Sequence, residues 1–204
     1  VELKRLRWSW LAKVFANDLF DVSGQGAGRF DLRFERGVSG AGTAEAVWDS
    51  VPLQARADFR WRDGRLAVGP LLGTSPAGTF DGRVSYTASE LDVSGQVTHG
   101  DPVHWHAIGL RGWPSGDLAG RMHYRSWRKG PAGSSFEAAL GGSLLAGWRA
   151  DSARVRVDAP SGLPGTFAVT MWRRGGRMDL DAGMDRGAWQ GTWKAERFPL
   201  EEWP

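Results

Sequence analysis

The nonapeptide GTFDGRVSY (residues 78–86) recurs 38 residues later as GDLAGRMHY (residues 116–124), with both glycines, the arginine and the tyrosine in register. A weaker third copy, GAWQGTWKA (residues 187–195), begins 71 residues after the second. Polar and apolar residues alternate in these copies, which is the pattern of a β-strand with one face toward a core. The repetition predicts a strand-and-turn module used several times along the chain.

The second glycine of each copy, Gly82 or Gly120, falls inside its predicted strand. A missing side chain at such a position indicates a bulge or a sharp bend. Phe80, Val84 and Tyr86 share one face with Gly82, so each repeat contributes an apolar row with a gap in its middle. A sheet that bends at regular intervals is expected to curl.

The two-residue period continues along most of the chain, for example over 30–34 and 57–61. The 29 glycines and ten prolines leave little uninterrupted length for helices. Asp63-Gly64 and Gly175-Gly176 each stand between alternating runs and predict tight hairpin turns. The pattern predicts an all-β fold, a long curved antiparallel sheet of roughly ten to thirteen strands joined by hairpins.

The opening segment, residues 1–20, has a helical period. Its apolar residues are Leu3, Leu6, Trp10, Leu11, Val14, Phe15 and Leu19, and they recur about every 3.6 residues. We expect this amphipathic helix to pack on the sheet; the alternative is a basic helix that meets a membrane surface or a partner. The chain is thus divided into a helix, 1–20, and a repeating β domain, 21–204.

Composition excludes several classes of protein. Of the 26 basic residues 22 are arginine, and they alternate with acidic residues at a net charge of +3, whereas a nucleic-acid surface concentrates its basic residues. No cysteine is present, so neither disulfides nor thiolate metal sites are expected. No apolar run is long enough for a membrane-spanning helix, and the charged opening is not a signal peptide. Because the chain begins with valine, we expect a fragment whose targeting segment lies upstream.

One helix is too small to cover the apolar face of such a sheet. Closure into a sandwich or barrel would bury that face. An open sheet would instead leave an apolar groove, which needs an apolar occupant because large exposed patches are uncommon on soluble proteins.

Several phrases resemble the AsmA-like and TamB family of bacterial envelope proteins. They are the hairpin LQARADFRWRDGRLAVGPL (residues 53–71), glycine-led strands such as GTFDGRVSY, and the short connectors VPL (from Val51) and FPLEEW (from Phe198). The resemblance covers the chain from about residue 20 to its end. It implies an elongated, U-shaped β-groove with an apolar concave face. It also implies a periplasmic role in phospholipid transport or outer-membrane protein assembly beside an Omp85-type barrel, with no catalytic residues and no cofactor. We expect the chain to be a middle segment of such a protein.

Acyl chains gain about 0.8 kcal/mol for each CH2 group that is buried, so an apolar groove can hold lipid tails while their head groups stay in water. The candidate lining consists of Phe30, Phe34, Phe59, Trp61, Tyr86, Trp105, Met122, Tyr124, Trp172, Trp189 and Trp193. The other interpretation of the same residues is an ordinary closed β core.

Sites for chemistry are weak in this sequence. His104, His106 and His123 could face one another across two strands and bind zinc, but no helical His pair or general base accompanies them. Asp179 and Asp181 share a strand face, as charged residues on a solvated face commonly do. No Gly-x-Ser-x-Gly motif is present. We therefore expect a non-enzymatic protein without a metal.

Two further functions remain open at this point. Tryptophan-rich β surfaces stack on sugars, and a closed sandwich or barrel presenting Trp105, Trp113, Trp127 and Trp148 would be a carbohydrate-binding module. The same closed sheet could also be a structural spacer of the envelope that binds nothing.

Overall fold

The computed structural model describes most of the chain. The described residues are 2–7, 24–48, 51–76, 78–100, 118–127, 132–142, 144–145, 148–160, 165–185 and 188–199. All regular structure within them is β.

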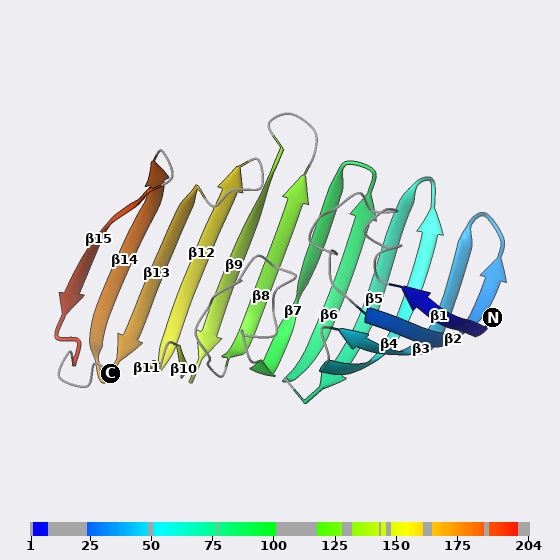
Figure 1. Ribbon diagram of the computed structural model, residues 1–204, viewed down its shortest axis with the longest axis horizontal. Helices are drawn as coiled ribbons and strands as arrows, with labels where there is room; N and C mark the ends of the chain where they lie inside the picture. Colours follow the sequence, from blue (N-terminus) through cyan, green and yellow to red (C-terminus); the bar gives the residue numbers. More distant parts are fainter. Residues whose placement is uncertain are drawn as a thin grey trace.

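Thirteen of the strands form one antiparallel sheet (Figure 1). In sheet order they are β1 (Glu2–Arg7), β2 (Gly24–Phe34), β3 (Val38–Trp48), β4 (Val51–Arg62), β5 (Arg65–Ser75), β6 (Gly78–Thr87), β7 (Glu90–Gly100), β8 (Leu118–Trp127), β9 (Gly133–Gly141), β12 (Ser152–Pro160), β13 (Thr166–Arg173), β14 (Gly176–Asp185) and β15 (Ala188–Glu196). Two short strands, β10 (Leu144–Leu145) and β11 (Trp148–Arg149), pair with each other between β9 and β12. Consecutive strands of the large sheet are neighbours, as a meander of hairpins requires.

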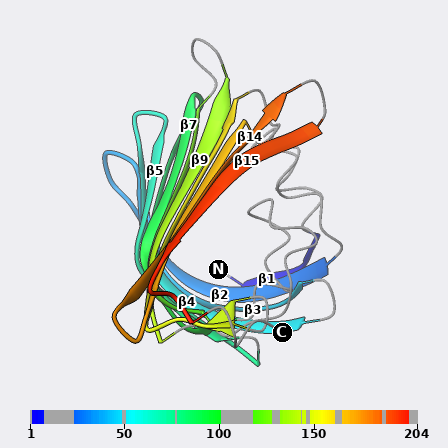
Figure 2. The same ribbon diagram turned by 90° about the vertical axis from the view of Figure 1, so that its left-hand side faces the viewer.

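The sheet is open. β1 and β15 lie at its two ends and do not pair within the described residues, so the sheet is neither a barrel nor a sandwich of two sheets. Figure 2 shows that the strands bend part-way along their length, which makes one face the inside of a trough. The expectation of an all-β, curved and open sheet is confirmed, and the alternative of a closed sheet is wrong for the described residues.

The helix expected over 1–20 falls mostly outside the described residues. The part that the structure describes, Glu2–Arg7, is strand β1, and it pairs with β2. Its register shifts between Leu3, opposite Gly28, and Leu6, opposite Gly26, so this end of the sheet carries an irregularity.

Two hairpins have the turn geometry that favours glycine. Asp63 and Gly64 have φ angles of 50° and 73°, and Arg174 and Gly175 have φ angles of 48° and 76°. Two successive residues with positive φ form the type I′ turn, whose twist matches that of the strands. The second turn lies one residue earlier than predicted, because Gly176 already belongs to β14. The VPL connector is also corrected, since Val51 begins strand β4.

The repeated glycines make room for neighbouring chain. A Cβ at Gly82 would lie 2.5 Å from the ring of Phe80 and 2.8 Å from the Cα of Gly95, and a Cβ at Gly95 would also meet the Phe80 ring. The gap in the apolar row is therefore covered by the aromatic ring of the same repeat. Gly120 has a φ of 150°, a conformation that only glycine adopts readily.

Two bulges interrupt the otherwise regular ladder. Gly69 and Pro70 of β5 lie opposite single residues on β4 and on β6, and Thr98 and His99 of β7 lie opposite one residue of β8. Proline inside a sheet is confined to such places because it cannot donate to the ladder. Bulges add local twist and bending, in keeping with the curl predicted from the repeat.

Candidate functional site

One face of the large sheet is apolar from β2 to β15. The residues that pair across successive strands form rows, and each row lies on one face. One such row is Phe30, Gly42, Ala57, Leu71, Gly82, Gly95, Met122, Ala138, Val155, Val169, Leu180 and Trp193. The next row is Leu32, Gly40, Phe59, Val68, Val84, Val93, Tyr124, Phe136, Val157, Phe167, Ala182 and Gly191. At the usual strand spacing, twelve strands make this face roughly 50 Å long.

The apolar face differs in exposure along its length. From β7 to β14 its residues form the core cluster, and Val97, Met122, Phe136, Leu140 and Val155 are all less than 9% exposed. Toward β2 the residues become half-buried or exposed: Phe34 is 72% exposed and Trp61 is 41% exposed. At the other end of the sheet, Trp193 is 63% exposed. The centre of the face is thus a protein core, and its two ends are accessible.

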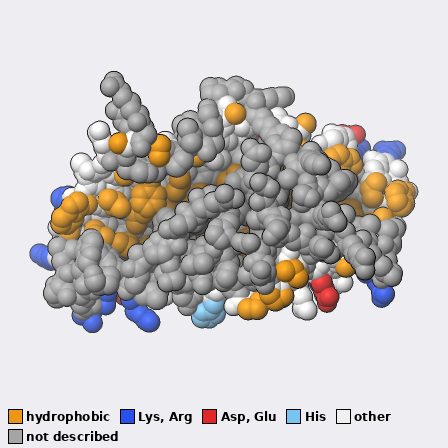
Figure 3. Space-filling view, in the orientation of Figure 1, with side chains coloured by type: hydrophobic (Ala, Val, Ile, Leu, Met, Phe, Trp, Pro, Cys, Tyr) orange, Lys and Arg blue, Asp and Glu red, His pale blue; other side chains and the backbone are white. Residues whose placement is uncertain are grey.

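The apolar face lines the inside of the trough. Figure 3 looks at the open side of the trough, and the hydrophobic side chains gather there near both ends of the sheet. Near β2 the rings of Phe30 and Phe59 meet edge to face, with their centroids 5.9 Å apart. Such aromatic pairs add to the stability gained from burial alone. The concave surface at this end is therefore apolar, aromatic and accessible.

The structure brings most of the candidate lining residues onto this one face. They are Phe30, Phe34, Phe59, Trp61, Tyr86, Met122, Tyr124 and Trp193, as the pairing register shows. Met122 and Tyr124 belong to the buried centre, where burial raises the pKa of the Tyr124 phenol. Near β2, Phe30, Phe34, Phe59 and Trp61 lie close enough to act together.

Trp172 is a correction to the candidate lining. In β13, Phe167, Val169 and Met171 occupy the apolar face, so Trp172 falls on the opposite one. There its ring lies 5.8 Å from the guanidinium carbon of Arg154, which is a cation–π contact. Trp105 lies outside the described residues, and for Trp189 the structure gives only its pairing with Met184.

Several residues of the accessible end were missed in the sequence. Leu32, Leu66 and Val68 are half-buried on the same face, and Phe80 covers the glycines of its repeat. Their signal was the two-residue period itself, counted forward from Phe30 or back from Tyr86. The candidate lining favoured large aromatic residues and omitted the aliphatic ones in phase with them.

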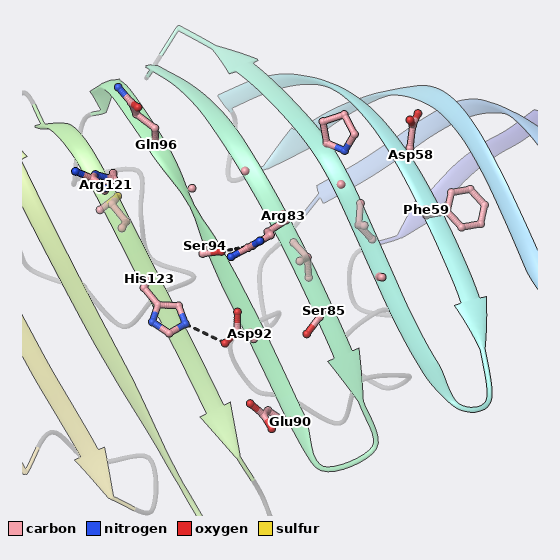
Figure 4. A pocket seen from close by; sticks show the side chains of 18 of the residues that line it. Asp58, Phe59, Arg83, Ser85, Glu90, Asp92, Ser94, Gln96, Arg121 and His123 are labelled. Atoms are coloured by element: carbon pink, nitrogen blue, oxygen red, sulfur yellow. Dashed lines mark hydrogen bonds and ion pairs between the residues drawn. The ribbon is translucent and has the colours of Figure 1, made fainter.

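The opposite face is polar and carries a broad, shallow hollow of about 2220 Å³ that extends from β2 to β13 (Figure 4). His123 and Asp92 approach each other to 2.9 Å from adjacent strands, and the Arg83 guanidinium donates a hydrogen bond to Ser94 at 3.1 Å. Farther along, Arg156 pairs with Asp158 at 2.8 Å. Acidic and basic groups in this hollow neutralise one another across and along the strands.

The polar face offers little for catalysis or metal binding. Among the described residues no group of three or more His, Cys, Asp or Glu side chains is placed to hold a metal ion. His123, from the proposed histidine cluster, lies on this face with its side chain 45% exposed, whereas His104 and His106 lie outside the described residues. Asp179 and Asp181 also lie on this face, and Asp179 is engaged by Arg177 and Thr170.

Asp179 predicts a pH dependence of stability. The pKa of its carboxyl is lowered, chiefly because Arg177 donates hydrogen bonds to it and to a lesser degree because Thr170 does. A carboxyl whose pKa is lower in the folded state stabilises the fold above its unfolded pKa, and this contribution is lost as pH falls through the folded value. We expect the urea midpoint to drop below about pH 4, and less so in Asp179→Asn.

The matched control for this prediction is Asp181→Asn on the same strand face. Asp181 has no hydrogen bond to Arg177 or Thr170 among the described contacts, so this variant should keep the wild-type slope. Identical pH profiles for wild type and Asp179→Asn would contradict the prediction.

Comparison with known proteins gives no relative from which a role can be transferred. No protein-family model, curated protein or solved structure matches the chain. In the part of the chain that the structure describes, no helix has the length and apolar character needed to cross a membrane.

Proposed function

We propose that this chain is a non-enzymatic segment of a lipid conduit, and that phospholipid acyl chains lie against its concave apolar face. The observation that carries the proposal is the accessible end of that face near β2. There Phe34 and Trp61 are exposed and Phe59 is half-buried in an open sheet. Exposed apolar surface of this kind calls for an apolar partner, and each buried CH2 group of an acyl chain contributes about 0.8 kcal/mol.

The resemblance to AsmA-like and TamB proteins supports the same proposal and supplies its setting. The conduit would stand in the periplasm of a diderm bacterium, between inner and outer membranes, with an Omp85-type barrel as a possible partner of the whole protein. The buried centre of the face limits lipid contact to the ends of this segment. Transfer along such a surface needs no catalytic residue, because the lipid only exchanges one apolar environment for another.

A charged residue in the groove tests the proposal. Phe59→Glu is expected to reduce phospholipid retained by the purified protein at least about tenfold, because a carboxylate among lipid tails is costly. Native mass spectrometry would count the bound lipids, and circular dichroism would show that the sheet remains folded.

The control is Leu72→Glu. Leu72 is 44% exposed, and its partners Arg56 and Asp81 place it on the polar face, so the same charge is added outside the groove. Its lipid content should equal that of the wild type. A wild-type protein that carries no lipid and takes up none, or equal losses in both variants, would exclude the lipid function.

Carbohydrate binding remains a weaker second candidate. Of the four tryptophans considered for a sugar platform, the structure describes the side chain of Trp127, which is half-buried at the end of β8. A glycan array with the purified chain would test it.

A further inference from the structure

Two neighbouring hairpin turns form a distinctive rim of the trough. The turn at 35–37 joins β2 to β3 and the turn at 63–64 joins β4 to β5, and both lie along the upper rim in Figure 1. Gly37 holds them together: a Cβ there would clash with the carbonyl oxygen of Trp61 and lie 3.3 Å from the Cβ of Arg62. The side chains of both turns therefore act as one surface, which we call the β2–β5 rim.

The inner side of the β2–β5 rim carries exposed aromatic residues. Phe34 and Trp61 stand two strands apart in one row, with Val38 between them. Of the described large hydrophobic residues on the apolar face, they are among the most exposed. Their position at the strand ends places them at the lip of the trough, before the buried centre.

The outer side of the same rim is basic. Five arginines stand there against two acidic residues, Glu35 and Asp63; the arginines are Arg33, Arg36, Arg60, Arg62 and Arg65. Arg62 and Arg65 are directly opposite each other at the end of the β4–β5 ladder. Arg62 also pairs with Asp63 at 3.2 Å, but both side chains are more than half exposed, so this pair adds little.

The Arg62–Arg65 pair costs stability in the free protein, because like charges directly opposite in a sheet repel each other. An anion that both guanidiniums contact would remove that repulsion. Guanidinium groups bind phosphates with paired hydrogen bonds, and aromatic side chains settle at the boundary between lipid head groups and acyl chains. The β2–β5 rim holds both kinds of group on the two sides of one edge.

From this arrangement we propose that the β2–β5 rim docks onto the surface of an anionic lipid bilayer. Phe34 and Trp61 enter the head-group boundary, and Arg36, Arg62 and Arg65 contact lipid phosphates. This inference extends the proposed conduit function, and it identifies the rim as the place where a lipid tail passes from bilayer to groove. The binding is electrostatic in part and therefore weakens as salt screens the charges.

Vesicle co-sedimentation tests the proposal. The wild-type chain should bind vesicles of phosphatidylcholine with 30% phosphatidylglycerol more tightly than pure phosphatidylcholine vesicles, and less tightly at high salt. Each arginine near an anionic surface contributes roughly a fivefold gain in binding, so the triple variant Arg36→Gln, Arg62→Gln, Arg65→Gln should bind on the order of a hundredfold more weakly. Removal of the like-charge pair should leave the variant folded and no less stable.

The matched control removes three arginines from the same face away from the turns: Arg29→Gln, Arg56→Gln and Arg121→Gln. It should keep most of the vesicle binding. Equal losses in the two triple variants, or no preference of the wild type for anionic vesicles, would overturn the proposal.

A second measurement follows insertion directly. The chain has no cysteine, so Phe34→Cys accepts a single polarity-sensitive fluorophore. Its emission should shift to the blue with anionic vesicles, whereas the same label at Leu72→Cys, on the other face, should not shift. A blue shift at Leu72→Cys alone would place the membrane on the polar face and refute the rim.

Failure of the groove and failure of the rim give different results. Uptake of dihexanoylphosphatidylcholine, supplied as monomers and counted by native mass spectrometry, reports the groove without a bilayer. If the wild type takes up none, yet only the rim variant loses vesicle binding, the rim stands and the conduit function fails. If uptake is normal and the rim variant still binds vesicles like the wild type, the rim is refuted and the groove remains.

Discussion

Gly120→Ala is expected to lower the free energy of unfolding by about 2–5 kcal/mol, which combines the cost of a positive φ with that of overpacking. Gly120 has a φ of 150°, and an added Cβ would clash with the carbonyl oxygen of Ala139 and lie 2.7 Å from the Cα of Leu140. Strand β9 would have to move away from β8 to admit one methyl group. Urea unfolding followed by circular dichroism measures the effect.

Gly141→Ala is the matched control for this prediction. Gly141 ends strand β9, lacks a positive φ, and has no neighbouring atom within 4 Å of the point that a Cβ would occupy. Alanine there should be neutral or slightly stabilising, because it reduces the freedom of the unfolded chain. Equal stability of the Gly120→Ala and Gly141→Ala variants would show that the repeated glycine is not required for close packing of strands.

Phe136→Ala is expected to destabilise the protein by about 3–5 kcal/mol, the usual cost of removing a large aromatic side chain from a core. Phe136 is 6% exposed and lies between Tyr124 and Val157 in the buried centre of the apolar face. Phe34→Ala, on the same face, should cost less than about 1 kcal/mol, since its side chain is already largely in water. Denaturant titration of both variants provides the comparison.

The two phenylalanines thus separate a core role from a binding role. Phe34→Ala should weaken vesicle binding without changing stability, whereas Phe136→Ala should change stability first. A large loss of stability in Phe34→Ala would mean that the accessible end of the face is packed by protein in solution, and the lipid proposal would then lose its site.

The division of the apolar face has a consequence for the proposed conduit. A groove that was open throughout would expose apolar rows across twelve strands, far more than soluble proteins usually leave uncovered. The buried centre supplies the stability of a conventional core, and the accessible ends are left for ligands. Function at the ends is therefore compatible with a folded, stable segment in the middle.

Local pattern was sufficient for much of the fold. The alternation around Phe30 and Phe59 predicted strands with one apolar face, and Asp63-Gly64 predicted its hairpin because a type I′ turn needs two residues that tolerate positive φ. Trp172 shows where the pattern was misapplied. Its size suggested a lining residue, but its phase in β13 places it with the charged residues.

The β2–β5 rim shows what local pattern cannot predict. Arg36 and Arg62 are separated by 26 positions in sequence, and nothing in either hairpin alone indicates that the two turns meet. Their contact depends on the pairing of β3 with β4 and on the close approach at Gly37. The exposure of Phe34 and the burial of Phe136 likewise depend on their distance from the end of the sheet.

The amino-acid sequence by itself determined that the chain forms hairpins with one oily and one charged side, because strand periodicity and turn preferences act over a few neighbouring residues. The tertiary structure alone decided that the sheet stays open, that its apolar side faces inward, and which part of that side is accessible. These properties arise from the accumulated twist, bulges and register of all the strands together, and no single segment encodes them.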